Sequence, residues 1–324
     1  MNFSNEQRSK ITGAIAISIA AILWGVDGIV LTPALYNLDV AFVVFMLHAI
    51  PFLIMNTFMY RQYRYLREFP SADLFLFIAI ALTGGAIGTI AVVKALFLVE
   101  FKKLTIVILL QKLQPVFAIA LATIILKEKL KRYYLVWASI AIVASYFLTF
   151  GTRLPDLQSG EKTVYAALFS LLAAFAFGSS TVLSKKVLGN YSFYTATFYR
   201  YGFTSLFMLI YVLAAGLINS FGEVTPRNWL YFLIIAFTTG SGAIFLYYYG
   251  LRKVRAIIST ICELFFPVSA IILDYLINHQ VLSAIQWISA AVLIFSIVNL
   301  NLSNSRAARK EKMLNFENNQ KKSL

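Results

Sequence analysis

Residues 11–31, ITGAIAISIAAILWGVDGIVL, form a stretch in which Asp27 is the only ionisable side chain. A helix of about 20 mostly apolar residues crosses the roughly 30 Å of hydrocarbon in a bilayer. The stretch therefore predicts a transmembrane helix. A β-barrel strand would instead alternate apolar and polar residues over about 10 positions, a pattern that these continuous apolar residues do not follow.

The composition extends this prediction to the whole chain. Of 324 residues, 60% are hydrophobic and only 13% are charged, with a mean hydropathy of +0.77. Soluble domains carry about 25% charged residues, so this much apolar surface cannot be buried in one soluble core. The single cysteine, Cys262, lies in an apolar stretch, which excludes a disulfide framework and a cysteine metal site. We expect no metal site and no cofactor.

Similar apolar stretches recur between charged residues, Pro, Asn and Gly, and they predict an all-α integral membrane protein with ten transmembrane helices. Their approximate ranges are 11–31, 40–60, 73–97, 104–126, 133–150, 163–184, 193–217, 228–250, 256–277 and 283–302. The first stretch lacks a cleavage site and is followed by further spans, so we expect a retained helix rather than a signal peptide. Residues 1–10 and the basic tail 303–324 are predicted to be cytoplasmic.

The basic residues indicate the orientation. With a cytoplasmic N-terminus, the inside segments hold 20 Lys and Arg residues and the outside loops hold 5. This asymmetry follows the positive-inside rule, so we expect both termini in the cytoplasm and the protein in the plasma (inner) membrane. The formal net charge of +14 is then explained by orientation and contact with membrane lipids rather than by binding to nucleic acid.

The two halves of the chain resemble each other. A shift of 152 residues places Pro115 on Pro267 and Gly88 on Gly240 without a gap. We therefore predict two repeats, 11–150 and 163–302. Since each repeat has five spans, an odd number, the second enters the membrane from the opposite side. Inverted repeats are typical of secondary transporters, because they provide related states open to either side.

Several motifs resemble the drug/metabolite transporter superfamily, specifically the ten-helix carriers of EamA type. The motifs are AAILWGVDGIVLTPAL at 20–35, VILLQKLQPVFAIALATIILKEKL at 107–130, FGSSTVLSKKVL at 177–188, FYRYGFTSL at 198–206 and STICELFFPVSAIILDYLINHQVL at 259–282. The resemblance implies two five-helix repeats and export or exchange of small organic metabolites. It covers about residues 11–302, with departures at His279 and Gln280 in place of Gly-Glu, and at His48 in place of Arg.

A charge at the bilayer centre costs at least about 2.5–3.5 kcal/mol, so ionisable residues in the spans should face a cavity or one another. They are Asp27, His48, Lys94, Lys112, Arg200, Glu263 and Asp274. Their depths place Asp27, His48 and Lys112 together in the outer half, and Arg200 with Glu263 in the inner half. We interpret the two groups as gates or substrate contacts; static neutralisation is the alternative. Lys94 and Asp274 lie near span ends, where side chains can snorkel.

Other residues of the spans are candidates for the substrate site. Tyr199 and Tyr247 could stack on a planar or cationic substrate, although an interfacial aromatic belt is the competing interpretation. Trp24, where the family resemblance begins, is a further candidate. Pro115 and Pro267 are predicted to break their helices and to free backbone carbonyls near the midplane. The glycine-rich stretches LTGGAIGT and FTTGSGA are interpreted as helix contacts that permit sliding.

We therefore predict a secondary transporter that moves a small polar metabolite, such as an amino acid or a nucleoside, by alternating access, in the direction of export or exchange. A multidrug or cationic-compound efflux carrier is the alternative, and a non-transporting receptor or scaffold the remote one. A proton or a counter-substrate is a candidate partner, with Glu263 and His48 as candidate proton carriers. No zinc-protease motif and no nucleophile elbow is present, so we predict no catalytic residue and no enzyme.

Overall fold

The computed structural model describes residues 5–98, 107, 110, 111, 113–152, 161–278 and 283–300. Within these residues all regular structure is helical. The first half contains α1 (Asn5–Val26), η1 (Asp27–Leu31), η2 (Thr32–Leu35), α2 (Val40–Met59), η3 (Tyr60–Arg64), α3 (Tyr65–Glu68), α4 (Ser71–Ile80), η4 (Ala81–Ile87), α5 (Gly88–Leu98), α7 (Gln114–Ile125) and α8 (Arg132–Phe150).

The second half is also built of long and broken helices. It contains α9 (Glu161–Val187), α10 (Phe193–Ala214), η5 (Leu217–Glu223), α11 (Pro226–Ile235), η6 (Ala236–Gly240), α12 (Ser241–Lys253), α13 (Ala256–Cys262), α14 (Phe265–Asn278) and a final helix, Ala284–Leu300.

Five continuous helical segments are long and apolar enough to cross a membrane. They are Asn5–Leu35, Val40–Glu68, Ser71–Leu98, Glu161–Val187 and Pro226–Lys253. The pair α10 and η5, bent by 96°, makes a sixth if it is counted as one span. Shorter apolar helices occupy the other predicted ranges: Gln114–Ile125, Arg132–Leu148, Ala256–Ala270 and Ala284–Leu300. The chain is thus a helical, multi-pass membrane protein.

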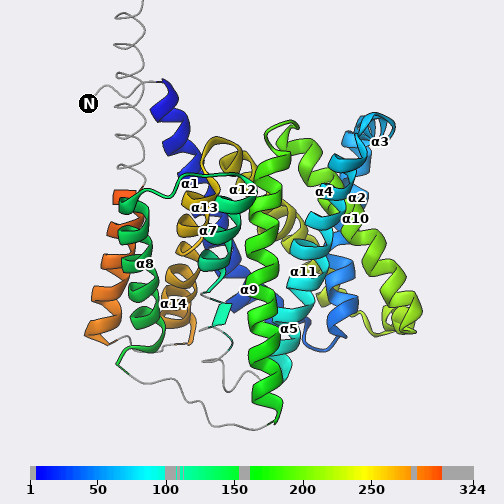
Figure 1. The fold of residues 1–324 in the computed structure, drawn as a ribbon. Helices are drawn as coiled ribbons and strands as arrows, with labels where there is room; N and C mark the ends of the chain where they lie inside the picture. Colours follow the sequence, from blue (N-terminus) through cyan, green and yellow to red (C-terminus); the bar gives the residue numbers. More distant parts are fainter. Residues whose placement is uncertain are drawn as a thin grey trace, which may run out of the picture.

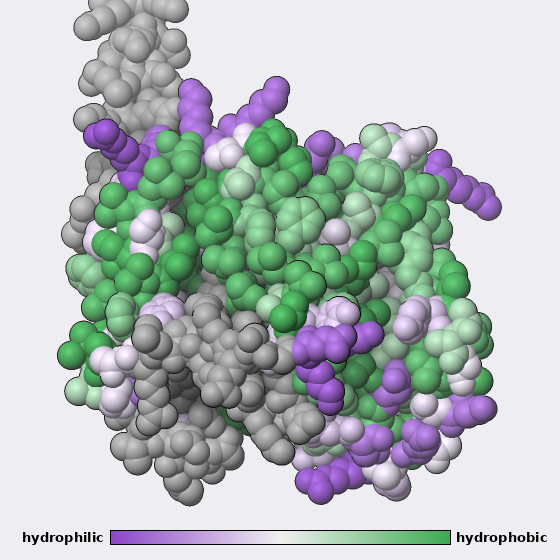
Figure 2. All heavy atoms as spheres, turned by 60° about the horizontal axis from the view of Figure 1, so that its bottom comes forward, coloured by the Kyte–Doolittle hydropathy of each residue, from purple (hydrophilic) through white to green (hydrophobic). Residues whose placement is uncertain are grey.

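The surface fits a bilayer environment. Large hydrophobic side chains are exposed on many helices, among them Leu53, Phe75, Ile124 and Phe237. Figure 2 shows hydrophobic residues covering the side of the molecule, with hydrophilic residues gathered toward its two ends. In water such a surface would drive aggregation, whereas lipid chains solvate it.

Local sequence signals explain where several helices begin. The Asp39 carboxylate accepts hydrogen bonds from the backbone N–H groups of Ala41 and Phe42, and so caps α2. Thr225 and Asn228 form a reciprocal capping box at the start of α11. Such caps satisfy N–H groups that have no partner inside the helix, and each contributes about 1 kcal/mol.

Small residues allow the helices of the two halves to approach closely. In Figure 1, α9 crosses the middle of the bundle, while α8 and the final helix lie side by side at one edge. A Cβ added at Gly250 of α12 would lie 2.4 Å from the carbonyl oxygen of Gly13 in α1. One added at Gly25 would lie 2.0 Å from Ser269 Oγ in α14. At Gly250 a side chain would meet backbone, so glycine is required there, whereas at Gly25 the Ser269 side chain would have to shift to admit a Cβ.

Three of the spans contain a π-helical turn, at η1, η4 and η6. The segments η4 and η6 fall on the glycine-rich stretches that the sequence analysis interpreted as helix contacts. A Cβ at Gly84 would lie 2.1 Å from Ser180 Oγ, and one at Gly85 would lie 2.0 Å from Thr204 Oγ1. These contacts agree with that interpretation for η4. The π-turns themselves were not predicted. Such turns are rare in proteins, and those that occur are often found at functional sites.

Candidate functional site

Two helix breaks bring a carboxylate and an amide together in the interior. Pro115 is the second residue of α7, and Pro267 is the third residue of α14. Proline lacks an N–H group and is tolerated in the first turn of a helix, so each helix restarts at its proline. The breaks leave Gln114 at the start of α7 and Glu263 in the turn between α13 and α14. Each proline therefore lies next to, or four residues from, a member of this carboxylate–amide contact.

The Glu263 carboxylate is held by three uncharged donors. Gln114 Nε2 donates to Oε2 at 2.7 Å, while the hydroxyls of Tyr247 (2.8 Å) and Ser259 (3.2 Å) donate to Oε1. The Thr181 hydroxyl lies 2.8 Å from that of Tyr247 and continues the network. Among the described residues, no basic side chain lies within ion-pair distance of Glu263.

Two aromatic side chains pack together beside this carboxylate. The rings of Trp24 and Tyr247 lie 5.3 Å apart at 54°, in a tilted arrangement. Tyr247 and Ser259 are buried, yet Glu263, Gln114 and Trp24 keep part of their surface accessible. We call these six residues the Glu263 cluster: Trp24, Gln114, Thr181, Tyr247, Ser259 and Glu263. It presents an acceptor, an amide and an aromatic face at one place in the interior.

The Arg200 guanidinium is held in a second network, next to the first. Its Nη2 donates to the carbonyl oxygen of Gly84 in η4 (2.8 Å), and its Nη1 donates to the hydroxyls of Tyr248 (3.1 Å) and Ser180 (3.4 Å). The Ser184 hydroxyl lies 2.8 Å from that of Tyr248. Arg200 is buried, and its Nε has no hydrogen-bond partner among the described residues. These contacts tie α10 to the π-turn of η4.

The direct Arg200–Glu263 pair proposed from depth is not formed. Each residue instead bonds one of two consecutive tyrosines, Tyr248 for Arg200 and Tyr247 for Glu263, whose rings lie 5.8 Å apart. Neutral hydroxyl groups therefore separate the charges, because the protein satisfies each charge with its own hydrogen bonds.

The proposed outer group is only partly described. Lys112 lies outside the described residues. Asp27 accepts hydrogen bonds from the hydroxyls of Thr32 and Thr239, both at 2.9 Å. The Nδ1 atom of His48 lies 2.8 Å from the carbonyl oxygen of Val44, and its ring packs on Tyr201 at 5.2 Å. Asp27 and His48 are thus held separately, by different partners.

Other candidates take positions away from the Glu263 cluster. Tyr199 donates to the carbonyl oxygen of Gln62 (2.6 Å) and packs on Phe69 and Phe77, which fits the aromatic-belt interpretation better than a substrate contact. Lys94 is exposed, with its ammonium 5.2 Å from the centre of the Phe169 ring, as expected for a snorkelling side chain.

A further polar contact joins the two halves at one end of the bundle. Glu128 accepts hydrogen bonds from the backbone N–H groups of Ala256 (2.9 Å) and Ile257 (3.4 Å) at the start of α13. Its Oε2 lies 3.4 Å from Arg255 Nε, and Arg255 also donates to the hydroxyl of Tyr134. Glu128 therefore caps a helix of the other half, which the family resemblance alone did not reveal.

Sequence reasoning missed the uncharged members of these networks. The missed residues are Thr32, Gln114, Ser180, Thr181, Ser184, Thr239, Tyr248 and Ser259. Some carried a signal: Gln114 directly precedes Pro115 in an apolar span, and Ser259 lies four residues before Glu263, one helical turn away.

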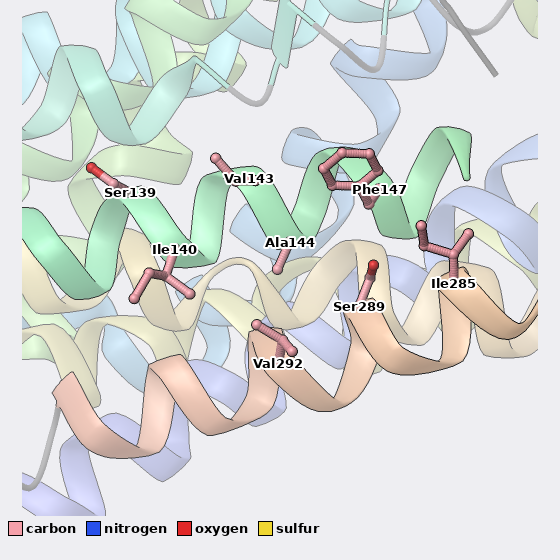
Figure 3. A pocket seen from close by; sticks show the side chains of 8 residues that line it. All are labelled: Ser139, Ile140, Val143, Ala144, Phe147, Ile285, Ser289 and Val292. Atoms are coloured by element: carbon pink, nitrogen blue, oxygen red, sulfur yellow. The ribbon is translucent and has the colours of Figure 1, made fainter. Parts of the chain in front are cut away.

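A surface hollow of about 420 Å³ lies elsewhere, between α8 and the final helix. Figure 3 shows its lining, which is apolar except for Ser139 and Ser289. Several lining residues, such as Val143 and Val292, are exposed on the hydrophobic surface. The hollow includes no member of the Glu263 cluster, so it is a groove facing lipid rather than part of the candidate site.

Comparison with known proteins gives consistent matches. The model of the EamA-like transporter family matches residues 11–150 and 164–302. A protein named riboflavin transporter ImpX, from Fusobacterium nucleatum, is 50% identical over 297 residues, which are 91% of this chain and 99% of that protein. An uncharacterised transporter from Synechocystis is 29% identical over 261 residues, covering 77% of this chain and 73% of the relative. These matches identify a transporter and not an enzyme, as predicted.

A solved structure supports the fold independently. A crystal structure that is 17% identical in sequence superposes with a TM-score of 0.64, over 94% of this chain and 99% of the other. At this identity the likeness concerns the fold alone.

Proposed function

The chain belongs to the EamA-like transporter family, and from this premise we propose that it carries riboflavin across the membrane. The observation that carries the proposal is the 50% identity to a riboflavin transporter over 99% of that protein's length. Riboflavin falls within the predicted class of small polar metabolites, since it is a nucleoside-like molecule with a sugar-alcohol chain.

The chemistry of the Glu263 cluster suits such a molecule. Riboflavin has a flat tricyclic ring, one edge of which carries an N–H donor between two carbonyl acceptors. The accessible carboxylate of Glu263 can accept from that N–H, and the Gln114 amide can donate to a carbonyl. The Trp24 and Tyr247 side chains supply an aromatic face for the ring. The ligand would compete with the Gln114–Glu263 hydrogen bond.

We further propose that transport proceeds by alternating access between two inverted five-helix repeats, with ten spans and both termini in the cytoplasm. Among the described residues, five long helical segments, one bent pair and four shorter apolar helices lie at the predicted ranges, and together with the internal similarity at a 152-residue shift they support this architecture. Substrate binding at the seam between α7 of the first half and the α13–α14 turn of the second would let relative movement of the halves expose it to either side.

Transport of labelled riboflavin tests the proposal. Cells that cannot make or import riboflavin would express the full chain, and both accumulation and release would be measured, because the family resemblance implies export or exchange. We expect saturable transport that unlabelled riboflavin inhibits and that amino acids and nucleosides do not. Transport equal to that of empty-vector cells, or equal inhibition by nucleosides, would contradict the proposal.

A matched pair of variants connects transport to the site. Tyr247→Phe removes one hydrogen bond to Glu263, and we expect the KM for riboflavin to rise about tenfold, equivalent to about 1.4 kcal/mol. Tyr211→Phe, on the exposed surface of α10, is the control and should leave the KM unchanged. Equal KM values in the two variants would show that Tyr247 does not contribute to the substrate site.

One observation favours a second function, efflux of organic cations. A carboxylate beside aromatic rings, without a basic partner among the described residues, is an arrangement that attracts cations. Resistance of the same cells to a lipophilic quaternary ammonium compound distinguishes the two functions. Increased resistance without riboflavin transport would favour efflux.

A further inference from the structure

The Asp27 carboxylate lies where three irregular helical turns meet. Asp27 is the first residue of the π-turn η1, and Thr32 opens the 3₁₀ turn η2 that follows it. Thr239 belongs to the π-turn η6 of a distant span and is 3% exposed. Its hydroxyl donates to Asp27 Oδ1, while that of Thr32 donates to Oδ2, both at 2.9 Å. The site therefore joins both halves of the chain.

The carboxylate has no counter-charge in the described part of the chain, where no basic side chain lies within ion-pair distance of it. An ionised acid within the bilayer costs at least about 2.5–3.5 kcal/mol unless something compensates it. Two hydroxyl groups offset part of this cost by hydrogen bonding, but they carry no net charge. A bound cation would remove the remaining charge.

The oxygen atoms at this place suit a small, hard cation. The carboxylate and the two hydroxyls belong to π and 3₁₀ turns, which depart from the regular hydrogen-bond ladder of an α-helix. Each threonine hydroxyl can rotate and offer a lone pair instead of its proton. Carboxylate, hydroxyl and carbonyl oxygens are hard ligands, and irregular intramembrane turns are where transporters hold ions.

We propose that Asp27, Thr32 and Thr239 form a binding site for a monovalent cation, a proton or Na⁺, whose movement drives that of the substrate. This inference rests on the proposed function, because it assigns the coupling ion of the same carrier. The two carboxylates then have different roles: Glu263 contacts the substrate, and Asp27 holds the ion.

The groups around Asp27 provide a route for coupling. Trp24 lies three residues before Asp27 on the same helical segment, and its ring packs on that of Tyr247 at 5.3 Å. Thr239 lies in η6, which leads directly into α12, and Tyr247 of α12 bonds Glu263. A movement of η1 or η6 that accompanies cation binding would therefore be passed to the Glu263 cluster.

Other ionisable residues lie on the elements packed against α1, η1 and η6. Their titration could also contribute to a pH dependence of transport. They are His48 on α2, Arg227 and Tyr231 on α11, Tyr247, Tyr248, Tyr249, Arg252 and Lys253 on α12, Glu263 after α13, and Asp274 and Tyr275 on α14. Arg227 bonds Tyr231, and Tyr247 bonds Glu263, so these four have partners of their own.

Purified full-length protein in liposomes tests the proposal with two kinds of riboflavin flux. Net accumulation would be driven by a pH gradient without Na⁺ in one arm, and by a Na⁺ gradient at equal pH in the other. Exchange of labelled for unlabelled riboflavin needs no gradient. We expect one gradient to raise accumulation by the wild type at least tenfold, and Asp27→Asn to abolish this increase while exchange stays within twofold of wild type.

Two further variants keep the test interpretable. Asp39→Asn is the control, because asparagine also caps helices and Asp39 lies outside the cation site. Thr239→Val keeps the size of the buried side chain, and we expect about a tenfold higher half-saturating Na⁺ concentration or a one-unit shift of the pH for half-maximal drive. This variant replaces Asp27→Asn as the decisive one if the latter does not fold.

Several outcomes would overturn the cation site without affecting the proposed function. These are wild-type accumulation that neither gradient increases, and gradient-driven accumulation that persists in Asp27→Asn. If riboflavin is not exchanged at all, the proposed function fails, and the site is judged by ion binding to the solubilised protein. Na⁺-dependent thermal stabilisation or proton release present in wild type and absent in Asp27→Asn would support it; equal values in both would overturn it.

Discussion

Replacing Glu128 by glutamine should loosen the contact between the two halves at one end of the bundle. The Glu128 side chain is only 10% exposed, pairs with Arg255 and accepts from two backbone N–H groups of α13. Glutamine keeps the size and one acceptor oxygen but loses the charge. A hydrogen bond to a charged group contributes about 1.5–3 kcal/mol, so we expect a loss of about 2 kcal/mol.

In the proposed alternating access, this arrangement, closed at the contact of Glu128 with α13, exchanges with one in which that contact is open, so the loss should fall on the closed arrangement. A shift of about 2 kcal/mol changes the ratio of open to closed molecules about 25-fold. Cys262 ends α13, is fully buried and is the single cysteine of the chain, so it reports the opening without further engineering. When opening is faster than thiol modification, the modification rate follows the open population.

The assay is the rate of maleimide labelling of Cys262 in membranes, which should rise about 25-fold in Glu128→Gln. Lys129→Gln is the matched control, because it removes a charge from the same loop but leaves the Lys129 carbonyl that accepts from Arg255. Arg255→Gln should speed labelling too, and adding it to Glu128→Gln should do little more. Labelling of Glu128→Gln within twofold of Lys129→Gln would refute this account.

Three other substitutions test separate parts of the structure. Gly25→Ala would place a methyl group against Ser269, and overpacking of this kind costs about 1–3 kcal/mol, so thermal unfolding in detergent should occur at a lower temperature than for wild type. In Arg200→Lys, the single ammonium group cannot reproduce the planar fork with which the guanidinium donates to Gly84 and Tyr248. Transport should therefore fall at least tenfold at equal expression. Full activity would show that the positive charge alone suffices. Asp39→Ala should lower stability by about 1 kcal/mol and leave the KM unchanged, as measured by unfolding and uptake.

The sequence was sufficient for the helical membrane class and for the helix breaks at the prolines. Apolar stretches, positive charges and prolines act locally, so their consequences can be read from the chain. Residues 193–217 were less simple than their hydropathy suggested. The helix α10 ends at Ala214 and the chain turns by 96° into η5, after Gly216 adopts a left-handed conformation that hydropathy does not encode.

The pairing of charges was harder to predict for a physical reason. The position of a residue along its span gives its depth in the membrane, which is one of its three coordinates. Depth does not say toward which neighbouring helix the side chain points. The prediction also assumed that an intramembrane charge needs an opposite charge. The structure satisfies Glu263 with Gln114, Tyr247 and Ser259, and Asp27 with threonines, and such neutral partners do not stand out in a sequence.

The π-turns η4 and η6 affect how these spans can change in length. A shift of 152 residues places Gly84 on Ala236 and Gly88 on Gly240, so the same place in each half holds one residue more than a regular helix would need. Deletion of one residue from an ordinary helix turns every side chain beyond it by about 100°. Here a deletion could be accommodated by a return to regular helix, which would keep the fold but break the contacts of Gly84 in η4 with Arg200 and of Thr239 in η6 with Asp27.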